Sequence, residues 1–187
     1  MREDTRAMET LQSPLYEVAD AFEANELFQR NGWTDGLPIV PPTESAVSRF
    51  LEAAGLAAGH VVGVEPVRRR RITAEKVAIA AVMAGGLPEY LPVVVAIVEA
   101  MCEPQFGFHG ATASTGGSAP FVVVNGPIRL ALGMNATHNV LGNGSRANAA
   151  IGRALRLLII NVLGGIPGQL DRSTLGHPGK FTLGLQM

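Results

Sequence analysis

The spacing of apolar residues along the chain predicts a mainly helical protein. A first helical pattern runs from Ser13-Pro14 to Asn31-Gly32, where glycine permits a left-handed cap. A second pattern covers 44–54, between the potential N-cap Thr43 and the potential stop Gly55. Both ends of this second helix are therefore predicted from local signals.

Two almost continuous apolar segments predict a pair of buried helices. They cover 74–84, after the potential N-cap Thr73, and 88–102, and are separated by Gly85-Gly86. Because both are apolar on most faces, we expect cover on several sides, part of it from another subunit. The longest predicted helix, 146–163, follows the potential N-cap Ser145 and carries one apolar stripe.

Three short runs predict strands, at 61–67, 121–125 and 180–185. The run 121–125 is wholly apolar, which is typical of a buried strand.

Two connections between the predicted elements stand out. Segment 33–42 holds three prolines and must lie extended, because proline has no backbone N–H to donate. Segment 105–118 is rich in glycine, serine and threonine and predicts a loop.

The length and composition of the chain fit a single domain. Its 187 residues are 47% apolar, which suffices for one ordinary core. We expect a single α/β domain over 13–187, with a short mixed or parallel sheet and several buried helices. Residues 1–12 are polar and predict a flexible N-terminal extension.

Charge is unevenly distributed, although the formal net charge is only −1. Segment 104–170 contains four arginines and no acidic residue, whereas 15 of the 16 acidic residues lie in 1–103. A positive local field favours an anionic ligand. The near-neutral total argues against non-specific nucleic-acid binding, which depends on many Lys or Arg contacts to phosphates.

The single cysteine, Cys102, excludes an internal disulfide framework and a multi-cysteine zinc site. It lies near a predicted helix C-terminus, whose negative end disfavours a thiolate, so we interpret it as inert. The N-terminal residues lack an apolar signal core, and the apolar segments are interrupted or too short to span a bilayer. We expect a cytoplasmic protein without membrane association.

The candidate anion site is the turn at the start of the longest predicted helix. Asn143, Gly144 and Ser145 bring flexible backbone to a helix N-terminus, where unpaired N–H groups attract carboxylate or phosphate. Arg146 and Arg153 follow, and an arginine fork can hold a carboxylate through two hydrogen bonds. We add Asn125 and Asn139 as candidate substrate ligands. The competing interpretation is a capped helix with solvated arginines.

The candidate acid and base are two histidines in glycine-rich segments. His109 precedes the predicted strand at 121–125, and His138 follows it. If the two segments meet, the imidazoles would transfer protons near neutral pH. A structural, hydrogen-bonded role remains the alternative for each. Neither histidine has metal-ligand spacing, so we expect no metal site, and the sequence identifies no cofactor.

Three further residues are candidates for the same site. Asp35 lies in the rigid proline-rich segment and could supply a catalytic carboxylate; alternatively, it forms an Asx-type turn beside a buried Trp33. Ser114 and Thr115 stand beside two glycines and could hold an oxyanion, although such segments are often only loops.

Several sequence runs between about Ala24 and Thr182 together resemble one bacterial protein family of unassigned chemistry. They are NGWTDGLPIVPPT, EKVAIAAVMAG with PEYLPVVVAIVEAM, VVNGPIR, HN with GNGSRANAAIGRALRLL, and GHPGKFT. Members are often encoded beside small proteins with a Sec/Cys-Gly-Ser-Cys (UGSC-type) motif. The resemblance implies a shared fold and a thiol- or selenol-bearing partner subunit, but no established reaction.

The chain departs from that family at two positions and at its end. Gly116-Gly117 stands where members have a His-Pro pair, and Gly86 stands where they have a cysteine. Many members also continue past the Gly-Lys-Phe segment. These departures imply that another chain completes the site.

These features predict an enzyme or enzyme subunit that binds a small anionic, carboxylate-like substrate. The expected chemistry is His-mediated acid–base catalysis of lyase, hydrolase or thiol-assisted type, in a homo-oligomer or a heteromer. The competing hypothesis is a non-catalytic scaffold subunit of a thiol or selenol enzyme, whose apolar 77–101 hairpin packs on the partner. A third is phosphate-ligand binding without catalysis.

Overall fold

The computed structural model describes residues 11–186, which form a mixed α/β fold. Its helices are α1 (Ala21–Arg30), α2 (Glu44–Ala54), α3 (Ala74–Met83), α4 (Leu91–Cys102), α5 (Phe108–Thr112), α6 (Ile128–Ala131) and α7 (Arg146–Asn161). Its strands are β1 (Val61–Val64), β2 (Arg71–Thr73), β3 (Val122–Val124) and β4 (Gly184–Gln186). Short 3-10 turns occupy Pro88–Tyr90, Pro104–Phe106 and Pro178–Lys180.

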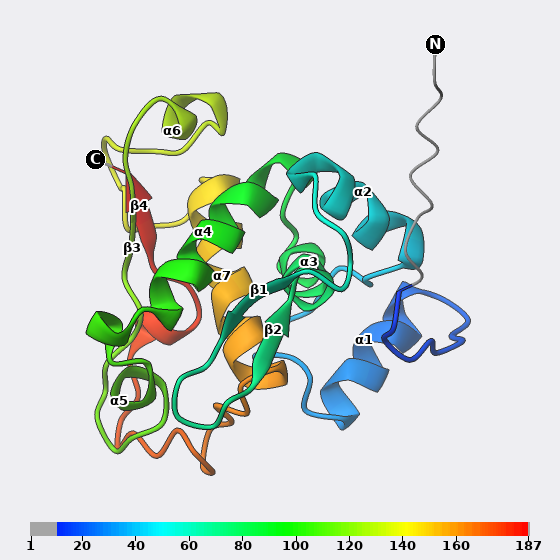
Figure 1. The fold of residues 1–187 in the computed structure, drawn as a ribbon, viewed down its shortest axis with the longest axis horizontal. Helices are drawn as coiled ribbons and strands as arrows, with labels where there is room; N and C mark the ends of the chain where they lie inside the picture. The colour runs from blue at the N-terminus through cyan, green and yellow to red at the C-terminus, as the bar shows by residue number, and fades with distance from the viewer. Residues whose placement is uncertain (1–10, 187) are drawn as a thin grey trace.

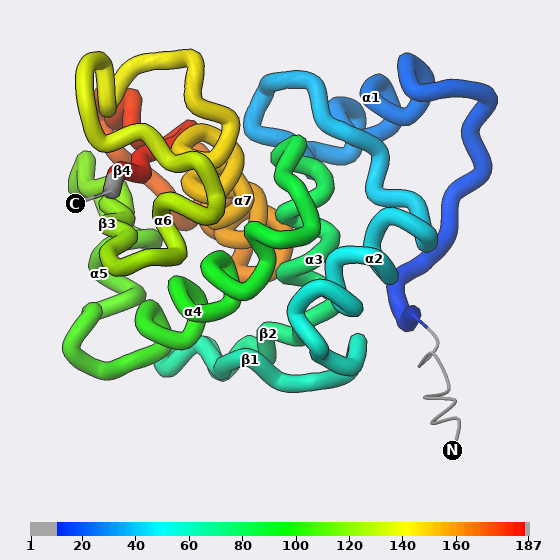
Figure 2. The backbone as a smooth tube through the Cα atoms, turned by 90° about the horizontal axis from the view of Figure 1, so that it is seen from above, coloured from blue at the N-terminus to red at the C-terminus, as the bar shows by residue number. Residues whose placement is uncertain are grey.

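Helix α3 lies at the centre of the fold and packs against α2, α4 and α7 (Figure 1). Viewed from above, α1 and α2 lie at one end of the molecule and β3, β4 and α6 at the other (Figure 2). Eight of the ten residues of α3 are buried, because the chain's own helices surround it. The expected cover on several sides is thus confirmed for α3, where this chain itself provides it, whereas α4 keeps an exposed face.

The predicted side-chain caps are present at α2 and α7, whereas Thr73 precedes α3 without a capping hydrogen bond from its side chain. The Ser145 hydroxyl accepts a hydrogen bond from the Asn148 N–H at the start of α7. Thr43 caps α2 in the same way, by accepting from the Ala46 N–H, and Gly55 ends that helix in the left-handed region with φ of 65°. These side chains satisfy backbone groups that have no partner within the helix.

The strands form two separate ribbons rather than one sheet. β1 and β2 pair antiparallel, and β3 and β4 pair parallel. The predicted strand at 61–67 ends early, because the Glu65 carboxylate accepts hydrogen bonds from the backbone N–H groups of Val67 and Arg68 and so forms a tight turn. The arginine run then enters β2, which the sequence did not predict. The coarse α/β prediction holds, with both parallel and antiparallel pairing.

The first helix begins at Ala21, not near Ser13, so that part of the prediction is wrong. The Asp20 carboxylate accepts from the Glu23 N–H at 2.8 Å and caps α1 there. Upstream, Gln12 and Ser13 lie against α3, where their backbone N–H groups donate to the buried Glu75 carboxylate at 3.1 Å and 2.8 Å. Residues 1–10 of the predicted flexible extension lie outside the described residues, and Gln12 is held in place.

Two further boundaries differ from the prediction. The segment predicted as a loop over 105–118 contains α5, which the buried side chain of Phe108 anchors in the core. The predicted strand at 180–185 is β4, which starts only at Gly184, because Pro178–Lys180 forms a 3-10 turn. Across residues 11–186, every helix falls short of the length and apolar character that crossing a membrane requires.

Candidate anion site

Arg146, expected beside a ligand at the start of α7, instead binds backbone. Its Nε donates to the Gly85 carbonyl at 2.8 Å, and one Nη donates to the Gly86 carbonyl at 3.1 Å. These carbonyls follow the C-terminus of α3, where a positive side chain is favourable. The guanidinium group therefore joins α7 to α3, and we do not retain it as an anion ligand.

The asparagines around the predicted turn hold loops together. The buried Asn148 accepts from the Asn135 N–H and the Ser145 hydroxyl, and donates to the carbonyls of Asn135 and Gly184. The amide oxygen of Asn148 thus accepts two hydrogen bonds, and its amide nitrogen donates two. This side chain joins α7 to the preceding loop and to β4.

The other candidate asparagines make similar local contacts. Asn139 has a positive φ of 59°, and its amide donates to the Asn143 carbonyl at 3.1 Å. The side chain of Asn125 accepts from the Gly126 N–H at 2.8 Å. Gly144 has open space around it, so the turn before α7 is accessible. These asparagines shape the loops on either side of α6.

Arg153 forms an ion pair with Asp35, the candidate catalytic carboxylate. Its Nε and Nη2 lie 2.8 Å and 2.9 Å from the two Asp35 oxygens, and Nη2 also donates to the Pro38 carbonyl. Burial alone would raise the pKa of Asp35, but the Arg153 guanidinium holds it below its usual value. The ion pair holds the proline-rich segment against α7. The charges of Arg153 and Asp35 balance each other.

The two candidate histidines are not brought together. His109 lies on α5 and His138 follows α6, and these helices stand at opposite ends of β3 (Figure 1). Both side chains are exposed. The condition for a shared acid–base pair, that the two glycine-rich segments meet, is therefore not met.

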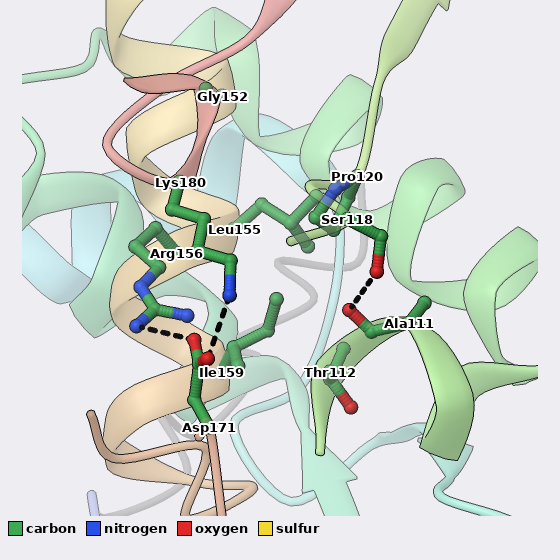
Figure 3. A pocket seen from close by; sticks show the side chains of 11 residues that line it. Ala111, Thr112, Ser118, Pro120, Gly152, Leu155, Arg156, Ile159, Asp171 and Lys180 are labelled. Carbon is green, nitrogen blue, oxygen red and sulfur yellow. Dashed lines mark hydrogen bonds and ion pairs between the residues drawn. The ribbon is translucent and has the colours of Figure 1, made fainter. Parts of the chain in front are cut away.

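A cleft lies between α5, α7 and the C-terminal segment (Figure 3). Its volume is about 10 Å³, room for roughly one water molecule. The lining combines apolar and polar groups: Ala111, Thr112, Ser118, Pro120, Gly152, Leu155, Arg156, Ile159, Asp171, Gly179 and Lys180. Only a small chemical group fits the cleft in this conformation.

The charged side chains of the cleft meet at Asp171. One Asp171 oxygen accepts from the Lys180 ammonium at 2.7 Å and from the Ser173 hydroxyl at 2.9 Å. The other accepts from Arg156 at 3.4 Å. Burial alone would raise the pKa of Asp171, but the hydrogen bonds from Lys180 and Ser173 bring it below its usual value. The cleft thus holds two cations and one ionised carboxylate.

Arg156 has capacity for a further acceptor. Its side chain is 12% exposed, and within the described part of the chain its one hydrogen bond is the long contact to Asp171. A guanidinium group carries five N–H donors. The close-up shows its nitrogens and the Lys180 nitrogen gathered on the same side of the cleft (Figure 3).

The predicted oxyanion loop lies beside the segment that carries Asp171, but Ser114 and Thr115 are not among the residues that line the cleft. The Ser114 hydroxyl donates to the Gly110 carbonyl at 3.0 Å and accepts from the Gly116 N–H, so it stabilises the turn itself. The Ser114 carbonyl accepts from the Arg172 N–H, which ties the loop to the Asp171 segment. Thr115 is exposed.

Sequence reasoning missed the residues that make the cleft. Arg156 is one of the four arginines of the acid-free zone, and Asp171 is the first acid after that zone, but no local motif singles out either residue. Lys180 lies in the GHPGKFT run, together with His177, whose Nδ1 accepts from the Gly179 N–H at 2.9 Å. That run was the available signal, but nothing in it indicates contact with α7.

No family model, no curated protein and no solved structure matches the chain significantly. The resemblance to a family with thiol-bearing partners therefore stays a prediction.

Proposed function

We propose that the chain is an enzyme, or the substrate-binding subunit of one, that takes a small carboxylate-like anion in the cleft between α5, α7 and the C-terminal segment. The observation that carries the proposal is that Arg156 and Lys180 share a single carboxylate, Asp171. One positive charge is thus unmatched at the cleft. An anionic ligand would balance it.

The lining supports a carboxylate ligand in particular. Arg156 offers a planar fork that matches the two oxygens of a carboxylate. Leu155 and Ile159 form an apolar wall beside it, and both are almost fully buried. Charge-assisted hydrogen bonds are stronger beside such a wall, because the local dielectric is lower than in water.

The acid–base chemistry is assigned to the histidines that lie within two residues of the cleft lining in the chain, His109 and His177. His109 lies on α5, the same short helix that contributes Thr112 to the lining. His177 is a second candidate, because it binds the N–H of Gly179, another lining residue. His138, at the far end of β3, is the weaker candidate. With an imidazole as proton donor or acceptor, lyase and hydrolase reactions are the proposed classes.

Thermal unfolding in the presence of acetate tests the binding part of this proposal. Ligands that bind the folded state raise the melting temperature in proportion to the logarithm of their concentration. We expect acetate to raise the melting temperature of the wild type at constant ionic strength, and Arg156→Gln to abolish that rise. Arg49→Gln is the matched control, because it removes an exposed arginine on α2. An equal rise in Arg156→Gln and wild type would overturn the assignment.

One observation favours the alternative, a scaffold subunit of a heteromeric thiol or selenol enzyme. The outer face of α4 leaves Pro92, Ala96 and Ala100 exposed, so this face of the apolar hairpin is uncovered. Under this alternative, Ala96→Glu would prevent assembly with a thiol-bearing partner while leaving the acetate effect intact. Size-exclusion chromatography of the co-expressed proteins would measure the loss of the complex.

A further inference from the structure

Resting on the proposed function, we infer that Asp171 sets the charge of the ligand, so that the cleft accepts monoanions, with one carboxylate head group, and rejects dianions. Asp171 lies between the two cations that would bind the ligand, and it neutralises one of them. The ligand class is therefore a small monocarboxylate rather than a phosphate monoester or a dicarboxylate.

Several donors hold the Asp171 carboxylate in its charged form. Its side chain is only 7% exposed and is held by Lys180, Arg156 and Ser173. The single proton of the Ser173 hydroxyl lies within reach of both Asp171 and the Gly116 carbonyl, and the hydroxyl oxygen accepts from Lys180. A carboxylate with this many donors is not readily displaced by an incoming anion.

Of the two cations, Arg156 is the one that remains for a ligand. Lys180 directs its short contact to Asp171, at 2.7 Å, whereas Arg156 reaches it only at 3.4 Å. Lys180 is therefore the cation that Asp171 mainly neutralises, and Arg156 keeps its charge for the ligand. A second negative charge on the ligand would lie near Asp171 without a cation of its own, which is unfavourable at short range.

The cleft is small. With about 10 Å³ available, it has room for roughly one water-sized group, such as one carboxylate oxygen, and the rest of the ligand would project outwards. Leu155 and Pro120 are apolar members of the same lining as Arg156. A carboxylate with a short aliphatic substituent matches a lining that combines a cation with apolar side chains.

Three small anions test charge selectivity separately from binding itself. Methanesulfonate and sulfate are similar in size but differ in charge, and acetate represents the proposed class. We would measure their dissociation constants by thermal shift at constant ionic strength, for wild type, Asp171→Asn and Lys180→Gln. Glu52→Gln removes an exposed carboxylate on α2 and serves as the matched control.

We expect the wild type to bind acetate and methanesulfonate more tightly than sulfate. Asp171→Asn should improve sulfate binding relative to methanesulfonate by about tenfold or more, which corresponds to about 1.4 kcal/mol. Lys180→Gln should weaken both monoanions, and Glu52→Gln should behave as wild type. An unchanged sulfate-to-methanesulfonate ratio in Asp171→Asn would overturn this inference alone. If the wild type binds acetate no better than chloride, the proposed function fails with it.

Discussion

Arg153 and Asp35, which are 118 residues apart in the chain, form a two-bonded ion pair between α7 and the proline-rich segment. The Asp35 side chain is only 3% exposed. A segment with three prolines contributes few backbone donors, so it needs side-chain contacts to lie fixed across the surface. The pair provides that attachment, together with the Arg153 bond to the Pro38 carbonyl.

Breaking this pair should destabilise the protein strongly. Asp35→Asn leaves the Arg153 guanidinium partly buried without its counter-charge, which costs about 3–5 kcal/mol for buried pairs. We expect a loss of this size in the free energy of unfolding, measured by urea denaturation. Glu52→Gln, at an exposed site, should stay within about 0.5 kcal/mol of wild type. A loss below about 1 kcal/mol in Asp35→Asn would contradict this structural role.

The contact between Glu75 and the 11–13 segment predicts a dependence of stability on pH. Burial alone would raise the pKa of Glu75, but hydrogen bonds from Ser13 and Gln12 bring it below its ordinary value of 4.5. The folded state therefore binds a proton less readily than the unfolded state. The stabilisation is complete above pH 4.5 and is lost as pH falls through the lowered folded-state pKa.

Glu75→Gln removes this titration and should flatten the acid limb of the stability curve. Urea denaturation midpoints from neutral pH down to the acid range would compare it with wild type. The variant should start less stable at pH 7 and lose less as the pH falls. Equal slopes in the two proteins would show that Glu75 does not contribute to the acid sensitivity.

Gly152 predicts a close-packing constraint inside α7. A Cβ at this position would lie 2.5 Å from the Thr182 hydroxyl and 2.8 Å from the Leu183 nitrogen. We therefore expect Gly152→Ala to destabilise the protein by about 1–3 kcal/mol, although alanine favours helix more than glycine. Gly110→Ala in α5 is the matched control, since no atom lies within 4 Å of the added methyl group. If both variants are equally stable, the C-terminal segment does not pack on α7 as described.

The parts of this fold that local signals specify were predictable. Ser145, Thr43 and Gly55 marked their helix ends, because capping involves residues within one turn. Asp20 was a capping residue too, but the apolar positions before it suggested an earlier start. In the structure Leu15 is 71% exposed, so its place in the sequence pattern did not indicate burial.

The site was less predictable, because its groups meet only through long-range contacts. The acid-free zone predicted an excess of positive charge, but the sequence does not indicate which arginines find partners within the protein. Arg146 binds carbonyls some 60 residues earlier in the chain, and Arg153 binds Asp35. Arg156 keeps donor capacity because its acid, Asp171, is shared with Lys180.

A crystal structure of the protein with acetate, at a concentration that saturates the thermal shift, tests the central claim most directly. The account predicts an acetate carboxylate within about 2.7–3.2 Å of the Arg156 guanidinium, with the Asp171–Lys180 contact retained. Acetate bound instead at the 142–146 turn before α7, with the cleft unchanged, would contradict it.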